Sequence, residues 1–280
     1  MTPSEQIQGT GRSIWDVRDR SGEWPAGWHV RHVEVTGSTN TDLLAAAASG
    51  APDRTVLAAD HQTAGRGRLD RRWEAPPGAN LLVSLLFRDV PETPGELVQR
   101  TALAAAEACR RVAGADVWLK WPNDLLLDGR KLAGILSQRA PGDPGSGARG
   151  GPVVVGLGLN VGWAPEGGAR LGAAVSRAAV LRALLEAHDE LPDDHHELVG
   201  RYRDRLDTLG RRVRVEIPDG EVVGRAIDVT DDGRLVVLDG CGVTHRLDVG
   251  DVVHVRPTGD GGNGGDGGDG DPSQGAEPRG

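Results

Sequence analysis

The chain has 280 residues, of which 38% are hydrophobic and 26% charged, and its formal net charge is −9. This length allows one large and one small domain whose cores need no disulfide or structural metal. The acidic balance argues against a protein that binds nucleic acid through its overall electrostatic field.

The hydrophobic pattern predicts strands and helices over residues 29–209, after an irregular segment at 1–28. In chain order, we expect a strand at 29–35, a helix at 42–48, strands at 55–60 and 81–87, a helix at 96–112, strands at 117–120, 131–138 and 153–160, and helices at 176–189 and 193–209. Ser38 or Thr39 is a good N-cap for the first helix. The pattern indicates a mixed α+β layer in which sheet and helices share one core, over residues 29–210.

From residue 211 the pattern changes to short strands separated by turns. The expected strands are 212–217, 222–229, 234–238, 243–248 and 252–255. Asp-Gly pairs lie in three of the connections and are typical of hairpin turns. We therefore expect a small β-barrel over 211–257, followed by a disordered tail rich in glycine and aspartate over 258–280.

A loop between two of the expected strands, at 61–80, carries the strongest local signal. Its segment 62–73 holds four arginines, two glycines and Trp73. Glycines let backbone N–H groups approach an anion, arginines match phosphate oxygens, and an aromatic ring can stack on a heterocycle. The segment is not a dinucleotide fingerprint, since Asp70 replaces the third glycine, and it lacks the GK[ST] of a P-loop. Taken alone, it is also compatible with a solvated basic loop or an RNA contact.

Two further segments carry polar groups next to apolar strands. Lys120 begins the run Lys-Trp-Pro-Asn-Asp, and a lysine in an apolar strand needs an anionic partner. Asp124 ends this run and is suited to a metal or a ligand N–H, although a simple turn acid explains it equally. Residues 153–160 form an apolar strand whose glycine pair permits close backbone approach and whose end presents Asn160.

Together these segments resemble biotin-protein ligases. The matching motifs, in family order, are Ser38-Thr39-Asn40, Gly65-Arg66-Gly67-Arg68 with Trp73 and Pro77-Gly78-Ala79-Asn80-Leu81, Lys120-Trp121-Pro122-Asn123-Asp124, Lys131-Leu132-Ala133-Gly134-Ile135-Leu136, and Gly158-Leu159-Asn160. The resemblance covers residues 29–256. It implies a catalytic α+β domain of the class II synthetase type followed by an SH3-like barrel, in the type of ligase that lacks an N-terminal DNA-binding domain.

The resemblance also implies roles for individual residues. Biotin would be bound by Ser38, Thr39, Asn40, Gln62, Arg66, Gly67, Arg68 and Lys131. ATP would be bound by Arg68, Arg71, Trp73, Asn123, Asp124, Lys131 and Asn160, with Asp124 meeting Mg²⁺ and with Lys131, Arg66 and Arg68 as catalytic residues. The main departure from the family is Leu69-Asp70, where many relatives have a residue followed by glycine, which puts the conformation of the loop in question.

The implied activity is the ATP-dependent formation of biotinoyl-AMP and the transfer of biotin to a lysine of a biotin carboxyl carrier domain of a carboxylase. A lipoate-protein ligase of the same fold and a non-catalytic RNA-binding module are the alternatives. We expect no DNA partner, because about 28 irregular residues before the first strand are too few for a winged helix. A homodimer is left open.

The cysteines and the hydropathy pattern bear on location. Cys109 and Cys241 show no zinc-like spacing and are expected to be reduced thiols. The N-terminus lacks the basic and apolar regions of a signal peptide, and no stretch approaches the roughly 18 apolar residues of a membrane span. We therefore expect a cytoplasmic protein without a membrane partner.

Overall fold

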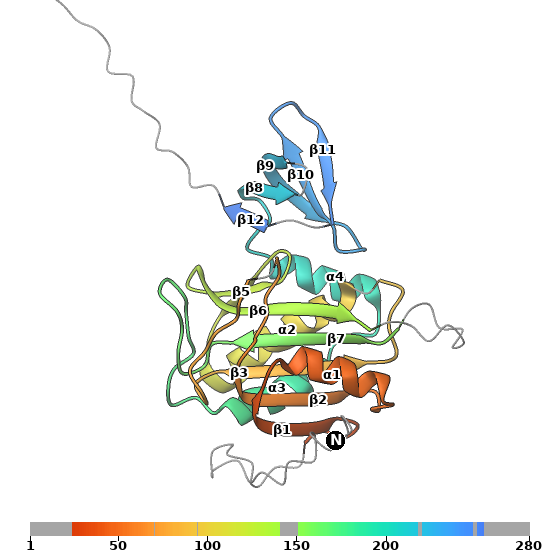
Figure 1. Cartoon of the computed structure of the whole chain (residues 1–280). Coiled ribbons are helices and arrows are strands. Elements are labelled where there is room, and N and C mark those ends of the chain that lie inside the picture. The colour runs from red at the N-terminus through yellow and green to blue at the C-terminus, as the bar shows by residue number, and fades with distance from the viewer. Residues whose placement is uncertain are drawn as a thin grey trace, which may run out of the picture.

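The computed structural model describes residues 24–69, 71–93, 95–140, 151–217, 220–248 and 251–254. These residues form a large sheet with helices and a smaller sheet above it (Figure 1). The expected irregular segment before residue 24 and the expected tail lie outside the described residues. Within them, no helix is long and apolar enough to cross a membrane.

The large sheet has seven strands in the order β1-β2-β3-β7-β6-β5-β4. They are β1 His29–Thr36, β2 Thr55–Gln62, β3 Leu81–Phe87, β4 Val117–Lys120, β5 Asp124–Leu127, β6 Arg130–Arg139 and β7 Val153–Leu159. The pair β1/β2 is parallel and all other neighbours are antiparallel. This mixed sheet confirms the α+β class expected from the sequence.

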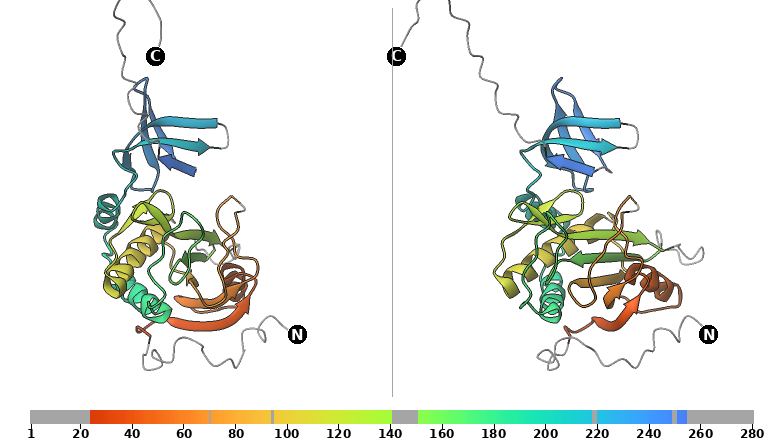
Figure 2. Two further views of the ribbon diagram at one scale, coloured as in Figure 1. Left: turned by 90° about the vertical axis from the view of Figure 1, so that its left-hand side faces the viewer. Right: turned by 60° about the vertical axis from the view of Figure 1, so that its left-hand side comes forward.

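Helices cover both faces of this sheet. They are α1 Thr39–Ala48, α2 Gly95–Ala113, α3 Arg177–Asp189 and α4 His195–Asp204. Figure 2 shows α1 on one face and α2 and α3 on the other. Because the central strands are covered on both sides, all seven residues of β3 are buried, and its sequence shows no alternation of apolar and polar residues beyond Ser84.

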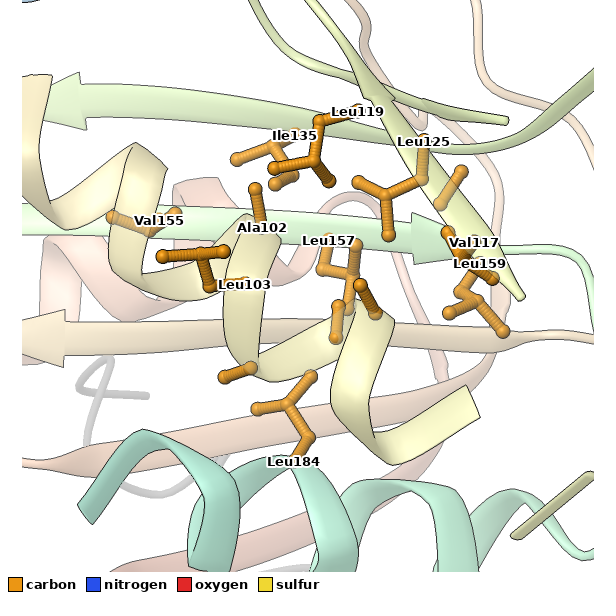
Figure 3. Packing of buried hydrophobic residues seen from close by; sticks show 14 of the residues in the cluster. Ala102, Leu103, Val117, Leu119, Leu125, Ile135, Val155, Leu157, Leu159 and Leu184 are labelled. Atoms are coloured by element: carbon orange, nitrogen blue, oxygen red, sulfur yellow. The ribbon is translucent and has the colours of Figure 1, made fainter. Parts of the chain in front are cut away.

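The main core lies between the sheet and the layer of α2 and α3. Ala102 and Leu103 of α2 face Val155 and Leu157 of β7, and Leu184 of α3 closes the cluster from below (Figure 3). Alanines on α2 allow the helix to approach the sheet closely, because they add no long side chain between the backbones. The smaller core on the other face contains Leu43 and Ala47 of α1.

Two elements differ from those expected. Strand β5 was not expected, since its four residues follow a turn and are too short to show a period, but pairing with β4 and β6 makes them a strand. Helix α4 ends at Asp204 and not near residue 209. The chain turns there because Leu119 of β4 donates a backbone hydrogen bond to Arg205 and accepts one from Asp207, so tertiary pairing overrides helix propensity.

The C-terminal strands form a separate antiparallel sheet in the order β11-β10-β9-β8-β12. They are β8 Arg212–Ile217, β9 Gly220–Val229, β10 Leu235–Asp239, β11 Thr244–Leu247 and β12 Asp251–His254. The buried residues of this sheet include Val213, Val215 and Val237. The expected order of a mixed sheet with helices followed by a small antiparallel β-domain is thus confirmed.

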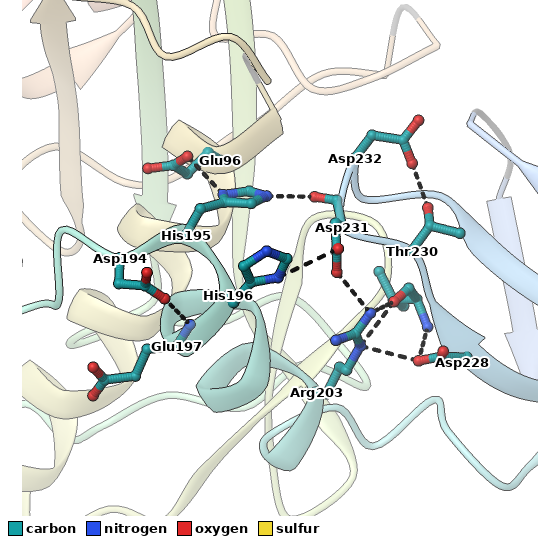
Figure 4. Close-up of polar contacts among 11 residues, drawn as sticks. Glu96, Asp194, His195, His196, Glu197, Arg203, Asp228, Thr230, Asp231 and Asp232 are labelled. Carbon is teal, nitrogen blue, oxygen red and sulfur yellow. Dashed lines mark hydrogen bonds and ion pairs between the residues drawn. The ribbon is translucent and has the colours of Figure 1, made fainter.

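Polar contacts join the two sheets through α2 and α4 (Figure 4). His195 of α4 lies between Glu96, at 2.8 Å, and the carbonyl oxygen of Asp231, also at 2.8 Å. Arg203 pairs with Asp231 and Asp228 of the C-terminal sheet. From the turn after β4, Trp121 Nε1 donates to the carbonyl of Gly233 at 2.9 Å. The turn after β4 is therefore held against the C-terminal domain.

Candidate functional site

A cavity of about 490 Å³ lies over the α1 face of the large sheet. Its walls come from the start of α1, the end of β2, the loop after β2, and strands β5, β6 and β7. All thirteen residues that the family resemblance assigned to a site line this one cavity: Ser38, Thr39, Asn40, Gln62, Arg66, Gly67, Arg68, Arg71, Trp73, Asn123, Asp124, Lys131 and Asn160. Residues up to 122 positions apart in the chain are thus brought together.

A chain of polar side chains forms the wall at α1. Ser38 caps the helix, as expected, and Thr39 donates its backbone N–H to Gln62 Oε1 at 2.7 Å. Thr39 Oγ1 lies 3.0 Å from the same oxygen. Asn40 donates to the carbonyl of Leu136 at 3.1 Å and to Gln138 at 2.8 Å. Its amide is thus used within the protein, which favours a role for Asn40 in holding α1 on the sheet.

Two glycines of β7 let side chains lie directly on the sheet. A Cβ atom at Gly156 would stand 2.2 Å from Asn40 Oδ1, and one at Gly158 would stand 2.4 Å from Trp73 Cε2. Both distances are far below van der Waals contact, so only glycine fits under the amide and the ring. The close approach predicted from this glycine pair is therefore made by the protein's own side chains.

A β-bulge aims Lys131 at the cavity. The register of β5 and β6 shifts so that Leu125 opposes Ala133 while Leu126 opposes Lys131. Leu132 and Ala133 are consequently both buried in the core, although consecutive strand residues normally face opposite sides. Without the extra residue Lys131 would point toward α2, and with it the lysine points into the cavity.

The charged groups of the cavity meet at β5 and β6. Lys131 Nζ lies 2.7 Å from Asp124 Oδ1 and 5.7 Å from the centre of the Trp73 ring. Nearby, Arg68 donates to Asn123 Oδ1 at 3.2 Å. Asn123 donates in turn to the carbonyl of Ile135 at 2.6 Å, which fixes its orientation. Lys131 and Arg68 thus line the same cavity, where both can bind an anionic group.

The arginine loop is folded back on itself. Gly67 donates to the carbonyl of Arg71 at 2.7 Å, and Trp73 donates to that of Gly65 at 3.0 Å. Between these contacts Leu69 has a φ of 54°, in the left-handed region, and its side chain is 67% exposed. A leucine there is strained where a glycine would not be. The glycine of many relatives corresponds to Asp70, which lies outside the described residues, so the effect of this departure on the loop stays a prediction.

Asn160 belongs to a buried network at the end of β7. It accepts from Asn80 at 3.1 Å and donates to the carbonyl of Ala169 at 3.0 Å. Asn80 also accepts from the backbone of Val161 and Trp163. These contacts shape the cavity end, and the nucleotide contact assigned to Asn160 stays a prediction.

Some residues of the site were missed or misjudged. Trp163 lines the cavity, and its only signal was a second tryptophan close to Asn160. Ser84 lies beneath Thr39 and Asn40, and the signal for it was a single polar residue in an apolar strand. Lys120, expected to need an anionic partner, lies half-buried in edge strand β4 and does not line the cavity.

Comparison with known proteins gives two family matches. Residues 32–160 match the Biotin/lipoate A/B protein ligase family, and residues 208–255 match the Biotin protein ligase C terminal domain. The chain is 43% identical to the biotin–[acetyl-CoA-carboxylase] ligase of Mycobacterium tuberculosis, over 82% of this chain and 91% of that protein. It is 28% identical to the bifunctional ligase/repressor BirA of Bacillus subtilis, over 78% and 71% of the two chains.

Solved structures share the fold. The biotin protein ligase of Aquifex aeolicus in complex with biotin and ATP superposes with a TM-score of 0.69 at 24% identity, covering 81% of this chain and 99% of that one. At this identity the likeness concerns the fold alone. It includes both the large sheet and the C-terminal strands, since it extends over most of each chain.

Proposed function

The chain belongs to the biotin protein ligase family, and from this premise we propose that it activates biotin with ATP and transfers it to a lysine of a biotin carboxyl carrier domain. The observation that carries the proposal is the single cavity lined by every residue that the resemblance assigned to the two substrates. A volume of about 490 Å³ is in the range of small-molecule sites. The match at 208–255 favours biotin over lipoate, because that domain is the one named for biotin protein ligases.

The first step forms biotinoyl-AMP. The biotin carboxylate attacks the α-phosphorus of ATP, the bond to the β-phosphate oxygen breaks, and pyrophosphate leaves. Negative charge gathers on the α-phosphate oxygens during this step. Lys131 is placed to stabilise this charge, since the bulge aims it at the cavity and its partner Asp124 holds it at 2.7 Å. Arg66 and Arg68 line the same space.

The groups around Asp124 fit a Mg²⁺ ion that arrives with ATP. Mg²⁺ at nucleotide sites is bound through one or two carboxylates and the substrate phosphates, so one carboxylate suffices. Within the described ranges no group of three or more His, Cys, Asp and Glu side chains forms a metal site of its own. We therefore propose Asp124 as the protein's contribution to the ion, which would neutralise part of the phosphate charge.

The second step transfers biotin to the acceptor. The lysine amine of the carrier domain attacks the carbonyl of the mixed anhydride, AMP leaves, and the amine proton is lost to solvent. Water would hydrolyse the same anhydride, so the loop holding Arg66 and Arg68 has to cover it in the meantime. The contact from Arg68 to Asn123 joins this loop to the opposite wall of the cavity, as such a cover requires.

The assigned domain bounds, 29–210 and 211–257, and the acyl-CoA carboxylase as source of the carrier domain are part of this proposal. The cytoplasmic location, the lack of a DNA partner and the oligomeric state stay predictions.

The decisive experiment is mass spectrometry of a biotin-acceptor domain after incubation with the enzyme, ATP and either biotin or lipoate. We expect a gain of one biotin on one lysine and none with lipoate. No gain with biotin would refute the proposal.

A lysine variant tests the mechanism. Lys131→Ala should lower biotin-dependent pyrophosphate release by roughly a hundredfold or more, because a preorganised charge is lost from the reacting phosphate. The neighbouring Arg130→Ala, whose side chain is exposed and outside the cavity, is the matched control. Wild-type rates in a folded Lys131→Ala protein would exclude the assigned role.

A further inference from the structure

Ser84 is a buried serine in the middle of β3, with no exposed surface. Its six neighbours in the strand are apolar. Its hydroxyl lies 2.7 Å from Thr39 Oγ1 and 2.6 Å from Asn40 Oδ1, directly beneath the part of α1 that lines the cavity. A polar group in this position is costly unless its hydrogen bonds are made, so the direction of each bond matters.

The direction of the bond to Asn40 follows from the other contacts of that amide. Asn40 Nδ2 has two hydrogens and donates them to the carbonyl of Leu136 and to Gln138 Oε1. The nitrogen is thereby identified, and Oδ1 can only accept. The single hydrogen of the Ser84 hydroxyl must therefore go to Asn40, which leaves the lone pairs of Ser84 Oγ for Thr39.

The bonds of Gln62 are determined in the same way. Its Oε1 accepts the backbone N–H of Thr39 at 2.7 Å, so this atom is the oxygen and not the nitrogen. The Thr39 hydroxyl then has two oxygen neighbours, Ser84 Oγ at 2.7 Å and Gln62 Oε1 at 3.0 Å, and one hydrogen to give. The three oxygen–oxygen contacts that link Asn40, Ser84, Thr39 and Gln62 in series therefore share only two hydroxyl hydrogens.

With the Ser84 hydrogen on Asn40, the 2.7 Å contact between Ser84 and Thr39 is a hydrogen bond only if Thr39 is the donor, and Ser84 is also the nearer of the two acceptors for Thr39. The oxygens of Thr39 and Gln62 then face each other at 3.0 Å without a hydrogen between them, at the wall of the cavity. Such a pair is satisfied by an N–H donor from a ligand. The ureido ring of biotin carries two N–H groups, and the carboxylate end of the molecule has none.

We propose that Ser84 is a positioning residue that turns the Thr39 hydroxyl inward and so leaves Thr39 and Gln62 as acceptors for a ureido N–H of biotin. The inference rests on the proposed function and adds the residue that sets the polarity of the biotin subsite. In Ser84→Ala the Thr39 hydroxyl loses its acceptor and donates its hydrogen to Gln62 instead. The contact between Thr39 and Gln62 is then a hydrogen bond within the protein and no longer needs an N–H donor from biotin.

The test measures biotin binding by calorimetry and ATP binding separately. Ser84→Ala should weaken biotin binding roughly tenfold, as expected for one neutral hydrogen bond with an unsatisfied partner, and leave ATP binding unchanged. Wild type should also bind biotin methylated at a ureido nitrogen much more weakly than biotin, and Ser84→Ala should lose most of this preference. A purely structural role of Ser84 would not change the preference.

The pair Ser84→Thr and Ser84→Val serves as the control, because the two side chains have the same shape and differ in the hydroxyl. Threonine should restore biotin affinity relative to valine, which also decides the matter if Ser84→Ala does not fold. Equal biotin affinities in this pair, or an unchanged preference in Ser84→Ala, would overturn the inference. Wild type that fails to bind biotin at all would instead overturn the proposed function.

Discussion

Gly158→Ala tests how tightly the Trp73 ring is packed on the sheet. The added Cβ would stand 2.4 Å from Trp73 Cε2, 2.6 Å from Nε1 and 2.8 Å from Cδ2. Carbon atoms approach to about 3.5 Å at closest, so the ring has to move by roughly 1 Å. Strand β7 cannot move in its place, since it is paired on both sides with β3 and β6.

The displacement should act on activity more than on stability. Overpacking of this kind costs about 1–3 kcal/mol of the free energy of unfolding. A shift of about 1 Å in a group that positions a substrate can lower the rate up to a hundredfold. We therefore expect biotin-dependent pyrophosphate release to fall by roughly ten- to a hundredfold, with a higher KM for ATP if the ring forms the adenine wall.

The assay is steady-state pyrophosphate release over a range of ATP concentrations, with thermal unfolding measured alongside. Gly200→Ala is the matched control: it introduces the same methyl group in α4, where no described atom beyond the adjacent helix backbone lies within 4 Å of the added Cβ, and it should keep full activity. It should also stabilise the helix by about 0.5–1 kcal/mol. Wild-type kinetics in Gly158→Ala would refute the packing of Trp73 described here.

Two further variants test the loop and the core. Arg68→Gly removes the contact to Asn123 and charge-assisted bonds of about 1.5–3 kcal/mol, so the loop should open and release biotinoyl-AMP ten- to a hundredfold faster. Serum albumin incubated with this variant, ATP and biotin should become biotinylated; unlabelled albumin despite ATP turnover would exclude the covering role. Burial, with smaller effects of the charges on Arg100 and Arg54, lowers the pKa of His188 from 6.5 to about 4. Between about pH 6.5 and pH 4 the unfolded chain therefore binds a proton that the folded chain does not. The stability present above pH 6.5 is lost as pH falls to 4, by on the order of 3 kcal/mol. His188→Leu should flatten the melting temperature over this range, and an unchanged slope in thermal unfolding would contradict the assignment.

Much of the molecule followed from local sequence. Helix α2 follows the 3.6-residue period, the buried strands β3 and β7 are short apolar runs, and α1 begins at its serine cap, because these features depend on neighbours along the chain. The site residues were found because their motifs combine residue types with particular chemistry at short spacing. The glycines of β7 signalled a close approach, since only a missing Cβ permits one.

The tertiary structure decided what the local pattern leaves open. Sequence spacing does not say that Asn40 lies on Gly156 and Trp73 on Gly158, because the partners come from distant segments. The bulge at Leu132 turns Lys131 into the cavity, and it arises from pairing with β5, a strand too short to be recognised by itself. Ser84 gains its importance from two residues of α1 that the fold places above it. A hydrogen bond between segments depends on register and packing, so its direction and its partner exist only once the sheet and the helices are assembled.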